Sequence, residues 1–219
     1  MSHERSDIAG AESFYSLEGS VCGTVAGIAN EHSIAAGCAQ AFRDAGADLV
    51  LTCREKSMSF VRPVANAIKP RLLLPLDVET DGALESVFNR IQSTFGRLDF
   101  VLHSIAFCPK QDFRGRVTDC SREGFARAMD VSVHSFIRMA RLAEPLMQAG
   151  GCLLTVSHYG AEKVVDHYNI MGPGEIGSRG NGALSCRRAR TARHSCQRPL
   201  TRPAQDASSV RDRSPRRAD

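Results

Sequence analysis

The sequence predicts an α/β fold in which one parallel sheet is covered by helices on both faces. Five short apolar runs recur between residues 21 and 157, and segments with apolar side chains at helical spacing separate them. Strands that alternate with helices in this way form right-handed βαβ crossovers, and these build a doubly wound parallel sheet. The chain has 219 residues, of which 42% are hydrophobic and 24% charged, enough for one such domain.

The elements follow one another along the chain in this alternation. The runs that we assign to strands are Val21–Ala26, Asp48–Cys53, Leu72–Leu76, residues 98–106 and residues 150–157. The segments that we assign to helices are residues 33–45, 59–68, 81–95 and 122–147. Ser33 can cap the first helix, and we expect Pro63 near the first turn of the second, where proline is tolerated. Leu84, Val87 and Ile91 give the third its apolar face.

Composition excludes several classes of protein. The eight cysteines contain no CxxC pair, which argues against a disulfide framework or a zinc site and favours reduced, buried thiols. No metal site is expected. No apolar run is long enough to span a bilayer, and no apolar segment follows the first basic residues. We therefore expect a cytoplasmic protein with no membrane partner.

Charge divides the chain into two parts. Residues 1–171 hold 17 Lys and Arg against 20 Asp and Glu, whereas residues 172–219 hold 11 Arg against four acids. The second part has only four large apolar residues, too few to offset the entropy of ordering it. We therefore expect an N-terminal extension (1–18), an incomplete α/β domain (19–172) and a disordered arginine-rich tail (173–219).

The arginine-rich tail permits a different function, the binding of nucleic acid or another acidic surface. Eleven arginines could neutralise phosphates. The tail has no aromatic residue to stack on bases, so composition alone explains its charge better and no specific nucleic acid is expected. Unchanged nucleic-acid affinity after removal of residues 173–219 would exclude this function.

Polar residues and glycines stand where the predicted strands end, the place where doubly wound sheets bind ligands. Gly27 could turn the backbone tightly and Ser33 opens a helix whose N-terminus attracts phosphate, although close packing explains the glycine equally well. Asp77 and Val78 could hold an adenine, or Asp77 could cap a helix. His103 fits a buried, hydrogen-bonded core residue better than a catalyst. Arg54 could meet a ribose 2′-phosphate, but a solvated surface arginine is the simpler interpretation.

Taken together, these residues resemble the short-chain dehydrogenase/reductase superfamily, and more closely its bacterial NADH-dependent enoyl-acyl-carrier-protein reductases of fatty acid biosynthesis. The stretches that carry the resemblance are "GIANEHSIAAG", "LPLDV", "LDFVLHSIAF", "VTDCSREGFARAMDVSVHSF" and "YGAEKVVDHYNIMG". It runs from about residue 19 to Gly172. The resemblance implies a Rossmann-like fold and the reduction of a trans-2-enoyl thioester held on acyl carrier protein. It also implies NADH as cofactor, with NADPH as the alternative, and a homotetramer.

The resemblance also assigns roles to matching positions. It implies that Gly27, Ser33, Ile34, Arg54, Asp77, Val78, Ser104, Ile105 and Ala106 line the cofactor site. It places Cys108 against the thioester and makes Tyr168 the catalytic tyrosine. The tyrosine hydrogen-bonds the thioester carbonyl and stabilises the developing enolate, while the cofactor supplies the hydride.

Two positions depart from the family pattern. His158 stands where the family has a second, supporting tyrosine of the catalytic site. Glu175 stands where the family has a lysine, seven residues after the tyrosine and two helical turns along one face. A carboxylate there reverses the field near the tyrosine hydroxyl, and Pro173 and Gly174 weaken the helix.

Beyond Gly172 nothing resembles the rest of the family, and the composition is that of a GC-rich gene read out of frame. We therefore hypothesise a frameshift near codon 172, which the nucleotide sequence in all three frames would test. The first hypothesis for the chain is an enoyl reductase. The second is a non-catalytic remnant that either binds nucleotide weakly or does not fold. We expect no turnover, impaired tetramer assembly, and poor solubility because a sheet edge is left uncovered.

Overall fold

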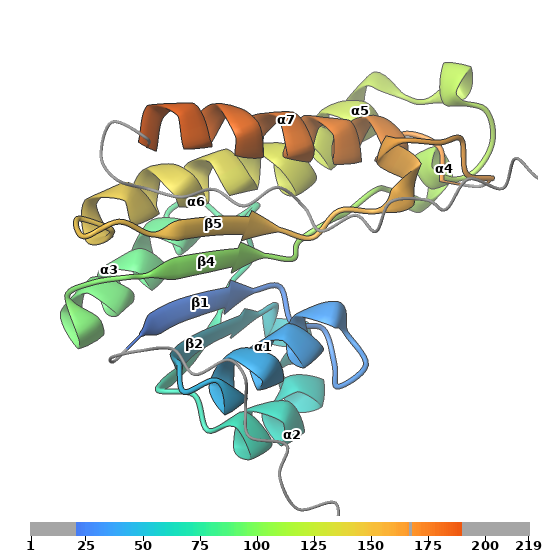
Figure 1. Cartoon of the computed structure of the whole chain (residues 1–219). Helices are drawn as coiled ribbons and strands as arrows, with labels where there is room; N and C mark the ends of the chain where they lie inside the picture. The colour runs from blue at the N-terminus through green and yellow to red at the C-terminus, as the bar shows by residue number, and fades with distance from the viewer. Residues whose placement is uncertain (1–20, 167, 190–219) are drawn as a thin grey trace, which may run out of the picture.

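The computed structural model describes residues 21–166 and 168–189, with side chains as far as residue 180. Five strands form one sheet in the order β3-β2-β1-β4-β5, and every neighbouring pair is parallel (Figure 1). The strands are β1 (Cys22–Ala26), β2 (Asp48–Cys53), β3 (Leu72–Pro75), β4 (Phe100–His103) and β5 (Cys152–Thr155). The predicted doubly wound sheet is confirmed, with all five strands in their expected runs.

Seven α-helices connect and follow the strands in the described part of the chain. They are α1 (Ile34–Asp44), α2 (Met58–Ile68), α3 (Ala83–Phe95), α4 (Lys110–Phe113), α5 (Arg122–Met129), α6 (Ser135–Ala143) and α7 (Met171–Ala189). Short 3-10 turns are η1 (Glu55–Ser57), η2 (Val117–Asp119), η4 (Glu144–Leu146) and η5 (Tyr159–Ala161), and η3 (Asp130–His134) is a π-helical turn that joins α5 to α6. The helical stretch predicted for residues 122–147 is therefore continuous as far as Leu146. None of the helices described is long and apolar enough to cross a membrane.

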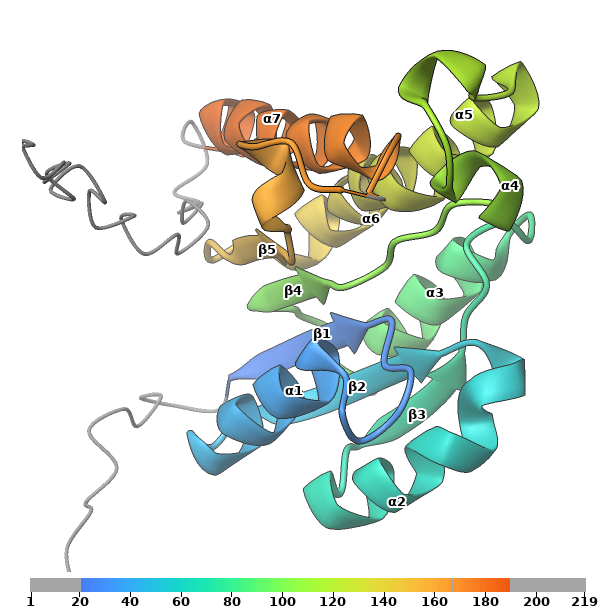
Figure 2. The ribbon, with the colours of Figure 1, turned by 90° about the vertical axis from the view of Figure 1, so that its right-hand side faces the viewer.

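The helices divide between the two faces of the sheet (Figure 2). On one face α1 and α2 pack on β1 and β2, with Ala35, Ala39, Val61 and Ile68 in the contact. On the other face α3 and α6 bury a second cluster. The core residues of these two helices in that cluster are Leu84, Val87, Phe88, Ile91, Met139 and Ala143. The predicted apolar face of the third helix is confirmed, and so is the cap at Ser33, whose hydroxyl accepts a hydrogen bond from the Ala36 amide.

Two sequence predictions are wrong. Pro63 lies in the middle of α2 and not in its first turn, because η1 precedes α2 and α2 itself begins at Met58. The second concerns residues 173–189, which were expected to be disordered but continue as helix α7. Pro173 is the third residue of that helix, where its missing N–H would have no intrahelical partner. The extension 1–18 and residues 190–219 lie outside the described residues.

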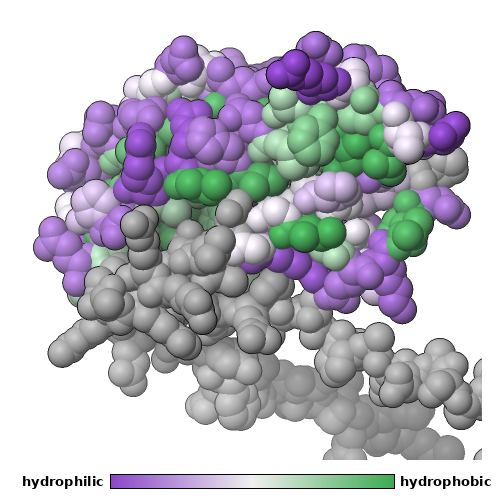
Figure 3. Space-filling model, turned by 90° about the horizontal axis from the view of Figure 1, so that it is seen from above, coloured by the Kyte–Doolittle hydropathy of each residue, from purple (hydrophilic) through white to green (hydrophobic). Residues whose placement is uncertain are grey.

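Helix α7 packs against η3, η5 and β5. Seen from the side that α7 covers, the surface shows apolar areas among hydrophilic ones (Figure 3). Ile176 of α7 is 57% exposed and Phe125 of α5 is 48% exposed. At the same end of the strand order, all four residues of β5 are only half-buried, whereas those of β4 are buried.

Candidate functional site

A pocket opens at the carboxyl ends of β1, β2, β3 and β4. Its lining includes Gly27 after β1, Arg54 after β2, Asp77 and Val78 after β3, and Ser104 and Ile105 after β4. Ala106 also lines it, so all the predicted cofactor residues except Ser33 and Ile34 lie along one hollow. The strand order reverses between β1 and β4, and ligands of open parallel sheets bind at that point.

Gly27 has both a conformational and a steric reason to be glycine. Its φ is +96°, a left-handed value that side chains rarely adopt. A Cβ at this position would stand 2.3 Å from the carbonyl oxygen of Ser104. The turn after β1 therefore packs directly on the turn after β4. Both interpretations offered by the sequence, a tight turn and close packing, hold together.

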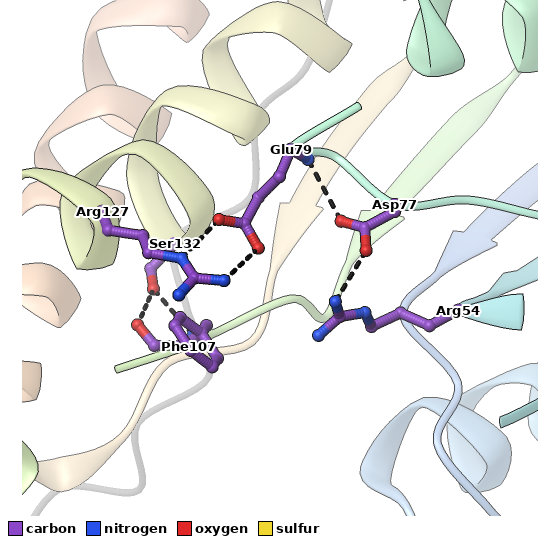
Figure 4. A network of polar contacts seen from close by, with 6 residues as sticks. All are labelled: Arg54, Asp77, Glu79, Phe107, Arg127 and Ser132. Carbon is purple, nitrogen blue, oxygen red and sulfur yellow. Dashed lines mark hydrogen bonds and ion pairs between the residues drawn. The ribbon is translucent and has the colours of Figure 1, made fainter. Parts of the chain in front are cut away.

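Charged residues along the pocket are paired with one another (Figure 4). Arg54 Nη2 lies 2.7 Å from Asp77 Oδ2, and the other oxygen of Asp77 accepts a hydrogen bond from the Glu79 amide. Arg54 is thus a partner in an ion pair and not a lone surface arginine. Asp77 does not cap α3, because Gly82 holds that position.

A second ion pair continues this network toward α5. Arg127 Nη2 donates to Glu79 Oε2 at 3.0 Å, and its guanidinium lies 4.6 Å from the centre of the Phe107 ring. Ser132 of η3 bonds the amide and the carbonyl of Phe107. The sequence did not identify Glu79, Phe107, Arg127 or Ser132 as site residues. Glu79 and Arg127 lie 48 positions apart, and a pairing over that distance leaves no local sequence pattern.

Ser33 and Ile34 stand apart from this pocket. The Ser33 hydroxyl donates to the Asn30 carbonyl at 2.7 Å and also caps α1, so its hydrogen-bonding capacity is largely used within the loop. Ile34 is 64% exposed. They lie at the N-terminus of an 11-residue helix, which favours an anionic group nearby.

His103 is a satisfied core residue, as the sequence indicated. It is 1% exposed, and its two ring nitrogens face Ser135 Oγ at 2.8 Å and Thr155 Oγ1 at 3.3 Å. Burial lowers the pKa of His103 to about 4. A neutral imidazole between two hydroxyls ties β4 to β5 and α6, and it does not face the pocket.

Tyr168, His158 and Glu175 form a second cluster beyond the carboxyl end of β5. The Tyr168 hydroxyl donates to Glu175 Oε1 at 2.9 Å, and the His158 amide donates to Glu175 Oε2 at 3.0 Å. The His158 ring packs on the Tyr168 ring with centres 4.4 Å apart. Tyr168 precedes α7, which begins at Met171, so in this chain Tyr168 and Glu175 do not lie on one helix face, although their side chains do meet.

Glu175 is 7% exposed, and both oxygens of its carboxylate accept hydrogen bonds. Burial raises the pKa of the Tyr168 hydroxyl, and the hydrogen bond and negative charge of Glu175 raise it further. Tyr168 is therefore held as a neutral phenol whose proton points to Glu175. This is the opposite of the electrostatic effect that a cation at position 175 would have.

Cys108 directly follows Phe107, which lines the pocket, and it is half-buried. Burial, then the nearby Asp112 and Cys120, raise the pKa of the Cys108 thiol to about 11, so it is a neutral thiol. In the described residues no three His, Cys, Asp or Glu side chains are grouped so as to hold a metal ion.

A doubly wound parallel sheet with its pocket at the switch point defines the class of this chain, a Rossmann-like α/β domain. The family described as enoyl-(acyl carrier protein) reductase matches residues 27–177. The chain belongs to this family.

Curated relatives agree with that assignment. The chain is 42% identical over 151 residues to the enoyl-acyl-carrier-protein reductase (NADH) 1 of Rhizobium meliloti and 44% identical over 150 residues to the enzyme FabI of Aquifex aeolicus. Each match covers 68% of this chain but 56% of the relative. The chain thus spans little more than half the length of these relatives.

Solved structures show the same fold. The Aquifex aeolicus reductase superposes with a TM-score of 0.77 at 38% identity, covering 80% of this chain and 70% of that one. The reductase of Anaplasma phagocytophilum, crystallised in complex with NAD, superposes with a TM-score of 0.78 at 33% identity, covering 87% and 74%.

Proposed function

We propose that this chain carries the nucleotide-binding part of an NADH-dependent enoyl-acyl-carrier-protein reductase and that Glu175 prevents its tyrosine from acting on a substrate. The observation that supports the proposal is the hydrogen bond from Tyr168 to Glu175, in a chain where seven of the nine predicted cofactor residues line one pocket. A substrate on acyl carrier protein and a cytoplasmic location belong to the same proposal.

The residues of the pocket suit the adenosine half of a nicotinamide dinucleotide. Val78, Leu76 and Ile105 supply an apolar wall, and the Asp77 carboxylate beside Val78 can accept a hydrogen bond from an exocyclic amine. Gly27 approaches Ser104 so closely that no side chain fits at this position. The turn after β1 therefore has no side chain where the diphosphate would pass. Arg54 stands where a ribose is expected, and it forms an ion pair with Asp77. Because an arginine here could also meet a ribose 2′-phosphate, NADPH stays the alternative cofactor. The bound cofactor would supply the hydride.

The obstacle to catalysis lies in the tyrosine cluster. In the proposed reaction the Tyr168 hydroxyl donates a hydrogen bond to the thioester carbonyl and stabilises the enolate oxygen. Here the same proton is already donated to a buried carboxylate at 2.9 Å. A carboxylate near a developing oxyanion also repels it. We therefore expect nucleotide binding without turnover. We assign His158 no part in the chemistry, because its ring packs on the tyrosine ring and its amide donates to Glu175.

The experiment is a pair of measurements on the purified, sequence-verified chain. Titration with NADH, followed by cofactor fluorescence, should show saturable binding that Asp77→Ala weakens. Oxidation of NADH by a trans-2-enoyl thioester should not exceed the rate without protein. Absence of NADH binding would refute the nucleotide-binding part, and measurable turnover would refute the role of Glu175.

We also propose that the chain is poorly soluble and assembles imperfectly into the family homotetramer. The half-buried β5 and the exposed Ile176 and Phe125 support this proposal, because exposed apolar surface favours aggregation. Light scattering of the purified chain over a range of concentrations tests it, and a stable, monodisperse tetramer would contradict it.

A further inference from the structure

Asp112 of α4 contacts the start of α5, nine residues further on, and the turn before α7, 57 residues further on. Asp112 is 3% exposed, and its Oδ1 accepts a hydrogen bond from the Ser121 amide, at the N-terminus of α5, at 2.7 Å. Its main-chain carbonyl accepts a hydrogen bond of 2.9 Å from Nδ2 of Asn169, the residue that follows Tyr168. Asp112 thereby joins its own segment to α5 and to the turn before α7.

The contact between Asp112 and α5 leaves no spare room. A Cβ placed on Gly124 would lie 2.0 Å from Asp112 Oδ2, so the carboxylate packs directly on the first turn of α5. The N-terminus of a helix favours a carboxylate at this place. This side chain therefore ties α4 to the first turn of α5.

Asn169 is energetically unfavourable in two ways: its backbone conformation is strained, and one of its buried polar atoms has no hydrogen-bond partner among the described residues. Its φ of +33° lies in the left-handed region, where asparagine is tolerated better than most residues but is still disfavoured. Asn169 Oδ1 and Asp112 Oδ2 are both buried, and neither has a hydrogen-bond partner among the described residues. Buried polar atoms without partners are rare in folded proteins because each one destabilises the fold. Strained backbone of this kind is concentrated at functional sites.

Asn169 and Asp112 are each next in the sequence to a residue of the cluster around the Tyr168 ring, Tyr168 itself and Phe113. The ring of Phe113, next to Asp112, meets the Tyr168 ring edge-on with centres 6.3 Å apart, while His158 packs on it at 4.4 Å. Cys108, the predicted thioester contact, begins the segment that contains Asp112 and Phe113. The hydrogen bond from Asn169 to Asp112 thus joins the segment that carries Tyr168 to the segment that follows Cys108.

We propose that Asn169 is a positioning residue: by bonding the main chain of Asp112, it fixes the Tyr168 ring relative to the segment from Cys108 to Phe113. This inference rests on the proposed function in taking Tyr168 as the residue that faces the substrate. Asn169 touches no reacting atom and acts through Tyr168 and Phe113.

The matched pair Asn169→Gly and Lys69→Gly separates positioning from stability. Lys69 is the other described non-glycine residue with positive φ, at +53°, and it ends α2 on the opposite face of the sheet. Glycine relieves the backbone strain at both sites, so both variants should fold. Only the first removes the hydrogen bond to Asp112. Asn169→Asp removes the donor while keeping the side-chain shape.

The measurement is NMR of the full chain with ¹³C-labelled tyrosine, together with amide hydrogen exchange. The chain has three tyrosines, and Tyr168→Phe identifies the signal of Tyr168. We expect Asn169→Gly and Asn169→Asp to shift or broaden that signal alone. The amides of Asp112 and Phe113 should exchange about fivefold faster, the effect of losing one hydrogen bond. Lys69→Gly should change neither.

An unchanged Tyr168 signal in both Asn169 variants would overturn the inference, and so would an equal change in every tyrosine signal, which would indicate general loosening. No nucleotide or thioester enters the experiment. A failure here therefore leaves the proposed function standing, and absence of NADH binding leaves this inference untouched.

Discussion

Replacing Glu175 by glutamine tests whether the carboxylate is held by the two donors seen in the structure. Glu175 is 7% exposed, and its carboxylate accepts hydrogen bonds from the Tyr168 hydroxyl and the His158 amide. A glutamine side chain has one oxygen, so one donor must face its NH₂ group. Tyr168→Phe, made alone and together with Glu175→Gln, isolates the tyrosine bond.

The magnitude follows from those two bonds. Hydrogen bonds to a charged group contribute about 1.5–3 kcal/mol and neutral ones about 0.5–1.5 kcal/mol, while an unpaired buried donor costs about 1–3 kcal/mol. Relief of the buried charge offsets part of this loss. We therefore expect Glu175→Gln to lower the free energy of unfolding by about 2 kcal/mol. The double-mutant cycle with Tyr168→Phe should give a coupling of about 1–2 kcal/mol.

Urea unfolding at neutral pH measures these differences, provided that the slopes agree between variants. Glu162→Gln is the matched control, because Glu162 also accepts from α7, through Arg179, but its side chain is 46% exposed. A surface pair of that kind contributes about 0–1 kcal/mol. Equal small effects at both positions, or a coupling near zero, would refute the assignment of Tyr168 and Glu175 as bonded partners.

The same geometry predicts the outcome of restoring the family's lysine alone. An ammonium at position 175 would meet two donors, so Glu175→Lys should destabilise the fold by about 3–5 kcal/mol, as expected for a buried charge without a partner. We expect it to restore no NADH oxidation. Recovery of activity should require the lysine helix and the rest of the family's C-terminal part together, and turnover by the single variant would contradict this.

Three further predictions concern the sheet and its turns. Gly27→Ala should lower the free energy of unfolding in urea by about 2–4 kcal/mol and abolish NADH binding, because the added Cβ would meet Ser104. The control is Gly46→Ala: Gly46 has a φ of +98° with open space around it, so this variant should lower the same free energy by only about 1–2 kcal/mol. Burial lowers the pKa of His103 from 6.5 to about 4, so the neutral side chain contributes about 3 kcal/mol to the free energy of unfolding above pH 6.5. This stability is lost as pH falls toward 4, and His103→Gln should reduce the loss measured by urea unfolding at acid pH. Burial, then Asp99 and Asp48, raise the pKa of Cys22 from 9.0 to about 12, so stability present below pH 9 falls as pH rises toward 12, and Cys22→Ala should make the alkaline unfolding curve shallower.

Local patterns predicted most of the fold. The alternation of apolar runs and amphipathic segments located all five strands, because strand and helix periodicity depend on neighbouring residues. Ser33 and the apolar face of α3 were predicted for the same reason. The prediction failed at α7, where apolar content was too low to indicate order, although η3, η5 and β5 provide a packed surface for the helix.

The candidate site was predictable only where each residue carries its own signal. Gly27, Asp77 and Tyr168 stand in recognisable stretches, and the structure places the first two along one pocket. Glu79 and Arg127 carried no signal, nor did the bond between Asp112 and Asn169, which lie 57 positions apart. Such pairs depend on how α4, α5 and the turn before α7 pack together.

The sequence by itself determined the order of strands and helices and the residue at each functional position, including a glutamate where the family has a lysine. Only the tertiary structure decided what that glutamate does. Tyr168 lies in a turn outside α7, yet the fold brings its hydroxyl to 2.9 Å from Glu175, which is buried, while Tyr168 itself is half-buried. A hydrogen bond of this kind, to a buried carboxylate, is set by the packing of whole elements, which no local pattern encodes.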